Sequence, residues 1–466
     1  MKFVQYYLDC LSQASYLIAD ESSKRAAIVD PRRDIQEYLD DAAAEGFRID
    51  YVIETHFHAD FLSGHLELAE ATGAEIIYGS AANPEFPIRR VVDGERITLG
   101  SDGGDGVVLE FRETPGHTPE SISVVVWERA SDAEPYGVLT GDTLFIGDVG
   151  RPDLLTSVGV TADELARDLY VSVHDKLLAL PDTTKVYPAH GAGSACGKNL
   201  STETVSTIGE QRRTNYAVQP MTVDEFVTAV TEGQTTAPSY FGFNAGLNKK
   251  EHGLLDTTVP APLGVDEVLA LQAGGTTVID TRDAASFAAG HLRNSVNVGF
   301  DGRFAEYVGS VVAPGTPLVL VTEPGLEAEA KVRLGRIGFD EVVGALDDGA
   351  AALIDRPETV TQSSRLTAFQ LEARTASTAV ALVDIRNPGE VRLGSIPDAT
   401  TIPLAELRAR VDELDLDQPL VVYCAGGYRS SIAASLLRSM GARDVSDLLG
   451  GYGAWQLAQP GQPTLV

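Results

Sequence analysis

The sequence is poor in cysteine and in basic residues. Its 466 residues include three cysteines, Cys10, Cys196 and Cys424, which lie far apart along the chain. A small, odd number of widely spaced cysteines argues against a disulfide framework. Lysine and arginine number 36 against 67 acidic residues, which gives a formal net charge of -31. Because nucleic acid and anionic membranes bind to basic patches, we expect neither as a partner.

The sequence also lacks a long apolar run. The first ten residues contain Asp9, and no later stretch is apolar for long enough to cross a bilayer. We therefore expect no signal peptide, no membrane span and a cytoplasmic location. The composition, 44% hydrophobic and 22% charged, is typical of globular proteins, and the length predicts two to four domains.

What the first half does contain is a series of metal-binding residue types, each placed just after a strand-like run. The run Tyr51–Glu54 precedes His56-Phe57-His58-Ala59-Asp60, and later runs precede His117 in Thr114-Pro115-Gly116-His117-Thr118, Asp142 in Thr140-Gly141-Asp142-Thr143 and His190 in Pro188-Ala189-His190-Gly191. Loops at strand ends are where α/β folds collect functional side chains. Imidazole and carboxylate groups in this arrangement predict a metal centre.

In this order, the motifs resemble the metallo-β-lactamase superfamily over roughly residues 1–245. The resemblance implies an α/β fold, an αββα sandwich, for this part of the chain. Members with two metals carry a histidine directly after the aspartate of the first motif, whereas this chain has Phe61 after Asp60. A phenyl ring has no lone pair to donate, so the second site loses a ligand, and a single metal is expected.

Within that superfamily, the chain is similar to the mononuclear persulfide dioxygenases. The resemblance implies one Fe(II) per chain, bound by His56, His117 and Asp142 as a facial triad with open positions for substrate and oxygen. For a second set of residues two roles stay open. These residues either line the pocket and orient the ligands, or they are structural; they are His58, Asp60, His190, Arg151 and Cys196. Cys10, His65, His174 and His252 are expected to be structural.

An internal repeat occupies the second half. Thr277-Val278-Ile279-Asp280-Thr281-Arg282 recurs as Ala381-Leu382-Val383-Asp384-Ile385-Arg386, an offset of about 100 residues. Two copies of this length predict two similar α/β domains in tandem. The repeat resembles the rhodanese fold. We expect a first copy at 262–355 and a second at 362–466, joined by a linker at Arg356–Ser364.

The second copy carries the active loop of the resembled family, Cys424-Ala425-Gly426-Gly427-Tyr428-Arg429-Ser430. A cysteine between a buried strand and a helix lies among backbone N–H groups, which stabilise a thiolate or persulfide anion. Arg429 adds a charge suited to an anionic sulfur donor such as thiosulfate. The first copy has Thr322 where the second has Cys424, so we expect that copy to lack the chemistry.

The sequence thus predicts a persulfide dioxygenase fused to a sulfurtransferase. Implied partners are a low-molecular-weight thiol persulfide, O₂ and sulfite or thiosulfate, and we expect a homo-oligomer. Two alternatives stay open. One is a zinc thioester hydrolase of the glyoxalase II kind with a rhodanese tail, against which Phe61 argues. The other is a persulfide-relay protein with a vestigial metal domain, against which the intact triad argues.

Overall fold

A computed structural model describes residues 1–101, 104–154 and 159–459 of the chain. The chain divides into two compact units, one made mainly of residues 1–234 and 240–255, the other mainly of residues 256–335 and 339–459. Both predicted rhodanese-like domains fall in the second unit, so the division into three domains stays a prediction. The last seven residues of the predicted third domain lie outside the described residues.

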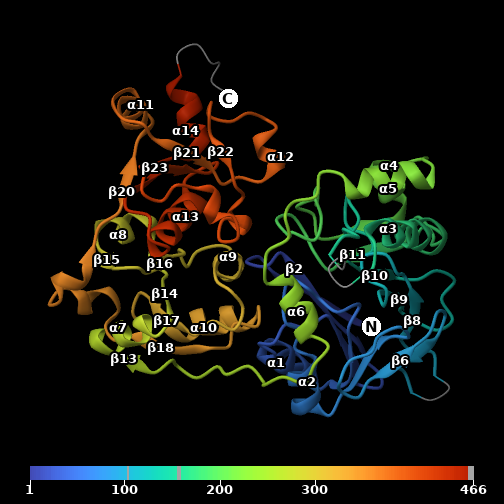
Figure 1. The fold of residues 1–466 in the computed structure, drawn as a ribbon. Helices are drawn as coiled ribbons and strands as arrows, with labels where there is room; N and C mark the ends of the chain where they lie inside the picture. Colours follow the sequence, from blue (N-terminus) through green and yellow to red (C-terminus); the bar gives the residue numbers. More distant parts are fainter. Residues whose placement is uncertain (102–103, 155–158, 460–466) are drawn as a thin grey trace. The chain divides into compact units, whose positions relative to one another are not determined.

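The first unit is built on two six-stranded sheets (Figure 1). The first sheet follows chain order: β1 (Lys2–Leu8), β2 (Gln13–Asp20), β3 (Arg25–Val29), β4 (Arg48–Ile53), β5 (Glu75–Gly79) and β6 (Arg89–Val91). The second runs in reverse chain order: β12 (Ser206–Thr207), β11 (Lys185–Pro188), β10 (Gly137–Gly141), β9 (Ile122–Trp127), β8 (Val108–Glu113) and β7 (Arg96–Thr98). Strands β3 to β6 pair in parallel, as do β10 and β11.

Three apolar clusters define the layers of this unit. Tyr16, Ile53 and Phe111 belong to the cluster that joins the two sheets. A second cluster packs helices α1 (Gln36–Glu45) and α2 (His65–Thr72) on the first sheet, and a third packs α3 (Ala162–Val171) and α5 (Val223–Thr231) on the second. The result is the predicted αββα sandwich. The other helical segments in the described residues of this unit are the π-helix Ser172–Leu177, α4 (Ile208–Thr214), the 3₁₀ helix Tyr216–Val218 and α6 (Phe241–Leu247).

The second unit contains the predicted repeat as two five-stranded parallel sheets of the same order. The first is β13 (Pro262–Leu263), β18 (Val342–Leu346), β17 (Leu318–Val321), β14 (Thr277–Asp280) and β16 (Val296–Asn297). The second is β20 (Ser364–Leu366), β24 (Val445–Leu448), β23 (Leu420–Tyr423), β21 (Ala381–Asp384) and β22 (Thr400–Thr401). The two rhodanese-like folds are therefore confirmed as an α/β repeat.

Helices flank each sheet of the second unit. They are α7 (Val265–Ala273), α8 (Ala284–Ala289), α9 (Phe304–Val311) and α10 (Glu327–Gly335) in the first copy, and α11 (Ala368–Ser377), α12 (Pro388–Val391), α13 (Tyr428–Ser439) and α14 (Gly451–Ala458) in the second. The segment expected to be a plain linker contains β19 (Val360–Thr361), which pairs with β15 (His291–Leu292). Every helix in the described part of the chain is too short or too polar to cross a membrane.

Candidate functional site

The three predicted metal ligands, and His190 of the second predicted set, follow the ends of strands in both sheets of the first unit. His56 comes three residues after β4, His117 follows β8, Asp142 directly follows β10, and His190 comes two residues after β11. Each of these side chains is at most 2 % exposed. The fold therefore brings together four side chains that are up to 134 residues apart in the sequence.

His56, His117 and Asp142 form a compact group. Asp142 Oδ2 lies 3.4 Å from His117 Nε2 and 3.9 Å from His56 Nε2. The two imidazole rings are nearly perpendicular, with centroids 4.9 Å apart. Ligand atoms around a transition metal at about 2.0–2.2 Å are separated by distances of this order. The three residues are therefore placed to hold one ion between them.

The other ring nitrogen of each histidine fixes its tautomer. His117 Nδ1 lies 2.9 Å from the carbonyl oxygen of Arg151, which can only accept, so Nδ1 carries the proton. The hydroxyl of Thr55 donates its hydrogen to Asp30, so it must accept from His56 Nδ1 at 2.9 Å. In the neutral form, each histidine thus presents an unprotonated Nε2 to Asp142, and this is the form that binds metals.

Three polar atoms of this group have no hydrogen-bond partner among the described residues, and their chemistry suits a bound cation. His56 Nε2 and both carboxylate oxygens of Asp142 are buried and have no hydrogen-bond partner. Buried polar atoms are rarely left unpaired, and such a set calls for an ion or a ligand. Burial and the neighbouring histidines also lower the pKa of His56 well below its usual value, which keeps the imidazole neutral.

His58, the second histidine of the first motif, belongs to a different group. Its Nε2 lies 3.1 Å from Asp30 Oδ1 and 3.3 Å from Glu54 Oε2. Burial alone would lower the pKa of His58, but the charges of Asp30 and Glu54 outweigh it and raise the pKa well above the usual value. The side chain therefore pairs with two buried carboxylates and stays outside the group of His56, His117 and Asp142. It also lies within ligand distance of Asp60 and His190, which form with it a second group that could hold a metal ion.

Asp60, His190 and Cys196 lie on the other side of Asp142. His190 Nε2 is 3.4 Å from Asp60 Oδ2 and 3.5 Å from Asp142 Oδ1. Phe61 is fully buried and offers no ligand atom; its ring centroid lies 4.3 Å from that of His58, and the two rings are tilted by 38°. Cys196 is grouped with Asp142 and His190. Burial and the charges of Asp60 and Asp142 raise the pKa of its thiol well above the usual value, so the thiol is protonated at neutral pH.

Arg151 braces the loop that carries Cys196. Its guanidinium makes hydrogen bonds of 2.7 and 2.8 Å to the two carboxylate oxygens of Asp153 and one of 3.2 Å to the carbonyl of Ala195. These contacts favour a structural role for Arg151 over a role in lining the pocket. Its neighbour Gly150 has no room for a side chain, because a Cβ there would lie 1.9 Å from the carbonyl oxygen of Asp142.

A cavity of about 390 Å³ leads to His117. Its apolar lining includes Phe57, Leu154 and Phe241. Lys249 and Lys250 contribute two positive charges to the lining, and Glu85 contributes one negative charge. The Lys249 ammonium lies 5.0 Å from the centroid of the Phe57 ring. The cavity suits a small ligand with an apolar body and a negatively charged group.

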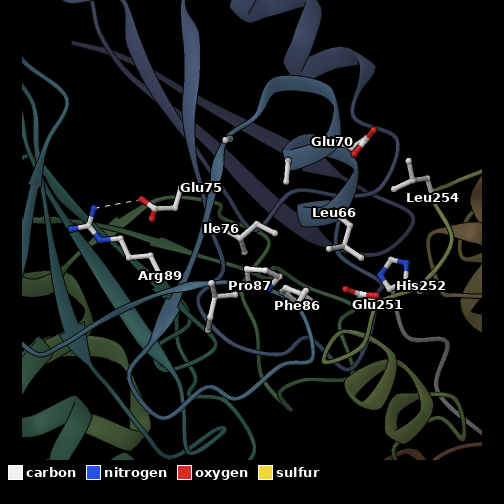
Figure 2. A pocket seen from close by; sticks show the side chains of 13 residues that line it. Leu66, Glu70, Glu75, Ile76, Phe86, Pro87, Arg89, Glu251, His252 and Leu254 are labelled. Atoms are coloured by element: carbon white, nitrogen blue, oxygen red, sulfur yellow. Dashed lines mark ion pairs between the residues drawn. The ribbon is translucent and has the colours of Figure 1, made fainter.

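A larger cavity, of about 650 Å³, lies between α2, β5 and the segment 251–254. Figure 2 shows Leu66, Ile76 and Phe86 along it, with Glu70 and His252 at its border. Arg89 there is paired with Glu75 at 3.7 Å. None of the predicted site residues lines this cavity, so its size does not make it the reaction site.

Cys424 begins the loop between β23 and α13 in the second rhodanese-like copy. Its side chain is 1 % exposed, and the backbone N–H of Gly427 donates to Sγ at 3.1 Å. The Ser430 hydroxyl lies 3.7 Å from Sγ. Gly427 has a φ of +102°, a conformation that favours glycine. The loop therefore curls around the sulfur, with Ala425 and Gly426 exposed to solvent.

Two side chains of this loop contact other elements. The Arg429 guanidinium donates two hydrogen bonds to Glu390, at 2.8 and 2.6 Å. The carboxylate of Glu390 therefore lies beside the positive charge of Arg429, which the sequence predicts to bind an anionic sulfur donor. The Tyr428 hydroxyl donates to the carbonyl of Gly299 in the first copy at 2.8 Å, so the first copy contacts the active loop of the second.

Thr322 occupies the equivalent position in the first copy, directly after β17. It is 2 % exposed, and Glu323 follows it in solvent. None of the three cysteines of the sequence falls in residues 262–355. This copy therefore offers no thiol for sulfur transfer.

The structure also identifies functional candidates that the sequence did not predict. Asp30 and Glu54 bind His58, Glu390 binds Arg429, and Asn248 bonds to the loop that carries His58 and Asp60. Asp30 was detectable as the end of a strand before Pro31, but its partner lies 28 residues away. Asn248 carries no local signal.

Models of known families match segments in both halves of the chain. Residues 8–190 match the metallo-beta-lactamase superfamily. Residues 264–355 and 367–458 each match the rhodanese-like domain. A solved metallo-beta-lactamase from Staphylococcus aureus subsp. aureus COL is 30% identical with a TM-score of 0.66, and the match covers 74% of this chain and 98% of that one.

Two curated relatives cover the first unit. Persulfide dioxygenase ETHE1, mitochondrial, from Bos taurus is 29% identical over 240 residues, which is 51% of this chain and 83% of the relative. Hydroxyacylglutathione hydrolase cytoplasmic from Arabidopsis thaliana is 32% identical over 187 residues, 40% of this chain and 66% of the relative. The first unit is thus similar both to a dioxygenase and to a thioester hydrolase.

Proposed function

The chain belongs to the metallo-beta-lactamase superfamily and carries two rhodanese-like domains, and on this basis we propose that it is an iron-dependent persulfide dioxygenase fused to a sulfurtransferase. The observation that carries the proposal is the separation of His58 from His56, His117 and Asp142. A set of two histidines and one carboxylate is the ligand set of non-haem Fe(II) oxygenases. A likeness to persulfide dioxygenases over half the chain supports the same choice.

The proposed first reaction is RSSH + O₂ + H₂O → RSH + SO₃²⁻ + 2H⁺. The S–S bond of the persulfide breaks, the terminal sulfur loses four electrons, and O₂ accepts them. Fe(II), when bound by His56, His117 and Asp142, supplies the redox-active centre that brings O₂ and the sulfur together. One iron per chain is expected.

The residues of the chain provide the surroundings of this reaction. Phe57, Leu154 and Phe241 exclude water from the cavity next to His117. Lys249 and Lys250 suit a thiol that carries a negative charge. The protonated Cys196 thiol is buried beside Asp142 and can donate a hydrogen bond there, although it does not line this cavity.

The proposed second reaction takes place at Cys424. With thiosulfate as donor, the thiolate attacks the outer sulfur, sulfite leaves with the electron pair of the S–S bond, and Cys424 becomes a persulfide. A low-molecular-weight thiol then removes that sulfur as its own persulfide. The Gly427 N–H, 3.1 Å from Sγ, stabilises the anion. Run in reverse, the same steps convert sulfite to thiosulfate, so the two sites together would dispose of sulfide-derived sulfur.

The test is oxygen consumption by protein loaded anaerobically with Fe(II) or with Zn(II). With glutathione or coenzyme A persulfide, we expect the iron form to consume one O₂ for each sulfite formed, including sulfite that Cys424 then converts to thiosulfate, and the zinc form to consume none. Oxygen consumption that is absent from both forms, with every persulfide tried, contradicts the proposal.

The second candidate function is thioester hydrolysis by a zinc enzyme. The Arabidopsis hydroxyacylglutathione hydrolase, at 32% identity, favours it. The same two preparations decide between the candidates when they are given S-lactoylglutathione. Hydrolysis by the zinc form would support the hydrolase, whereas we expect none, because His58 is paired with Asp30 and Glu54 and Phe61 replaces a ligand.

A further inference from the structure

Asn248 directly follows α6, and its side chain makes hydrogen bonds to the loop that carries His58 and Asp60. Its side chain is fully buried. Nδ2 donates to the carbonyls of His58 at 2.8 Å and Phe61 at 2.9 Å, and Oδ1 accepts from the N–H of Ser63 at 2.9 Å. One amide therefore makes three hydrogen bonds to the turn of residues 58–63, which is 185 residues or more away in the sequence. The turn is also held by hydrogen bonds from the Leu62 N–H to the carbonyl of Arg336 and from the Ser63 hydroxyl to that of Pro31.

This turn determines where His58 points. With the turn closed, His58 Nε2 lies against Asp30 and Glu54, and the Phe61 ring packs 4.3 Å from the imidazole. The ring of His58 is nevertheless only 4.1 Å from that of His56, centroid to centroid. A modest rearrangement of the turn would thus bring a fourth ligand to the group formed by His56, His117 and Asp142.

Such a rearrangement needs the loss of the Asn248 contacts. The carbonyls of His58 and Phe61 are buried, and both lose their hydrogen-bond donor if the turn moves away from Asn248. An unpaired buried carbonyl is costly, so the amide holds the turn in place. The carboxylates of Asp30 and Glu54 attract His58 in the same direction.

We propose that Asn248 is a positioning residue of the metal centre, which holds His58 outside the ligand set and so keeps the number of protein ligands at three. The proposal rests on the three-ligand centre of the proposed function. Asn248 touches neither metal nor substrate; it acts through the backbone of the turn. Three protein ligands leave adjacent positions open for two reactants, whereas a fourth would remove one of them.

The test uses Co(II), whose visible absorption reports its ligand set, in the full-length protein. Asn248→Ala removes all three hydrogen bonds, and Asn248→Asp keeps the acceptor for Ser63 but loses both donors. We expect both variants to bind one Co(II) with absorption bands that differ from those of the wild type. Adding His58→Gln to Asn248→Ala should restore the wild-type bands, because the extra ligand is then absent.

Asn297→Asp is the matched control. Asn297 is 1 % exposed, its Nδ2 donates to the carbonyls of Asp280 and Arg282, and its Oδ1 accepts from Ser431, all in the second unit. Its Co(II) spectrum should equal that of the wild type even if its melting temperature falls.

The outcomes separate the two claims. A wild-type protein that binds no Co(II) overturns the metal centre, and the role of Asn248 with it. In the other case, the wild type binds one Co(II) while a folded Asn248 variant shows the same spectrum and only a lower melting temperature. That result overturns the role of Asn248 but leaves the metal centre in place. A changed spectrum that persists in the double variant also overturns it, since His58 is then not the added ligand.

Discussion

The guanidinium of Arg429 and the carboxylate of Glu390 are joined by two hydrogen bonds, of 2.8 and 2.6 Å, beside the Cys424 loop. The charge of Arg429 lowers the pKa of Glu390 against the effect of its partial burial, so the pair is ionised at neutral pH. The loop therefore presents a neutralised arginine to an incoming sulfur donor. A thiol persulfide suits such a site better than the doubly charged thiosulfate.

Replacing Glu390 by glutamine should release the charge of Arg429. We expect kcat/KM for thiosulfate to rise about five- to tenfold, which corresponds to about 1–1.4 kcal/mol. Activity with a neutral or singly charged persulfide should change less. Steady-state assays with both donors measure the effect. A fall in kcat/KM with both donors would mean that Glu390 is needed to orient Arg429, contrary to this account.

His117→Ala should abolish metal binding and oxygen consumption, because a set of three ligands loses one of them. Sulfur transfer from thiosulfate should continue at the wild-type rate, since Cys424 lies in the other unit. Metal analysis and both assays on one preparation measure this. His174→Ala is a suitable control, because His174 stacks on Tyr170 and belongs to no potential metal group in the described residues. Oxygen consumption retained by His117→Ala would contradict the ligand assignment.

Cys424→Ser should abolish sulfur transfer, since Thr322 leaves the first copy without a thiol. With a preformed persulfide, we expect oxygen consumption to be unchanged and the product to shift from thiosulfate towards sulfite. With thiosulfate and thiol as starting materials, oxygen consumption should cease. If oxygen consumption is lost with preformed persulfide as well, Cys424 delivers substrate to the metal, and the two activities are not separable.

His291 should make the second unit sensitive to acid. Burial lowers its pKa to about 4, against the usual 6.5, while its Nδ1 donates to the carbonyl of Phe287. The unfolded chain therefore takes up a proton before the folded one does. This contribution to the free energy of unfolding is fully present above pH 6.5 and is lost as the pH falls towards 4, by about 3 kcal/mol.

Denaturation at pH 7 and pH 4.5 measures this loss, with Trp455 as the reporter in a Trp127→Phe background. His291→Gln should be less stable at pH 7 but should lose less stability between the two pH values. Equal pH dependence in both proteins would show that another group is responsible.

The sequence predicted those features that depend on local or repeated patterns. His56, His117, Asp142 and His190 follow strands whose runs are apparent in the sequence, and parallel strands bring their ends together. The duplicated pattern around Asp280 and Asp384 predicted two equal sheets, which the strand orders confirm. Cys424 was identified by its position between a buried strand and a helix.

The contacts of these residues could not be predicted in the same way, because each depends on a distant partner. Nothing near His58 indicates that Asp30 and Glu54 draw its Nε2 away from His56. Asn248 reaches the same turn from a segment with no motif. Glu390 lies 39 residues before Arg429 in the sequence, and its two hydrogen bonds to that arginine depend on the folded second copy.

The most direct test of the central claim is the metal content of protein isolated without oxygen and without added metal, measured by mass spectrometry of the acid-digested chain. The account predicts one iron per chain, held by His56, His117 and Asp142, and almost none in His117→Ala. Two zinc ions per chain would contradict it, because His58, Asp60 and His190 would then act as ligands of a dinuclear hydrolase. One zinc ion that iron does not replace would contradict it as well, because the centre would then not be an iron centre.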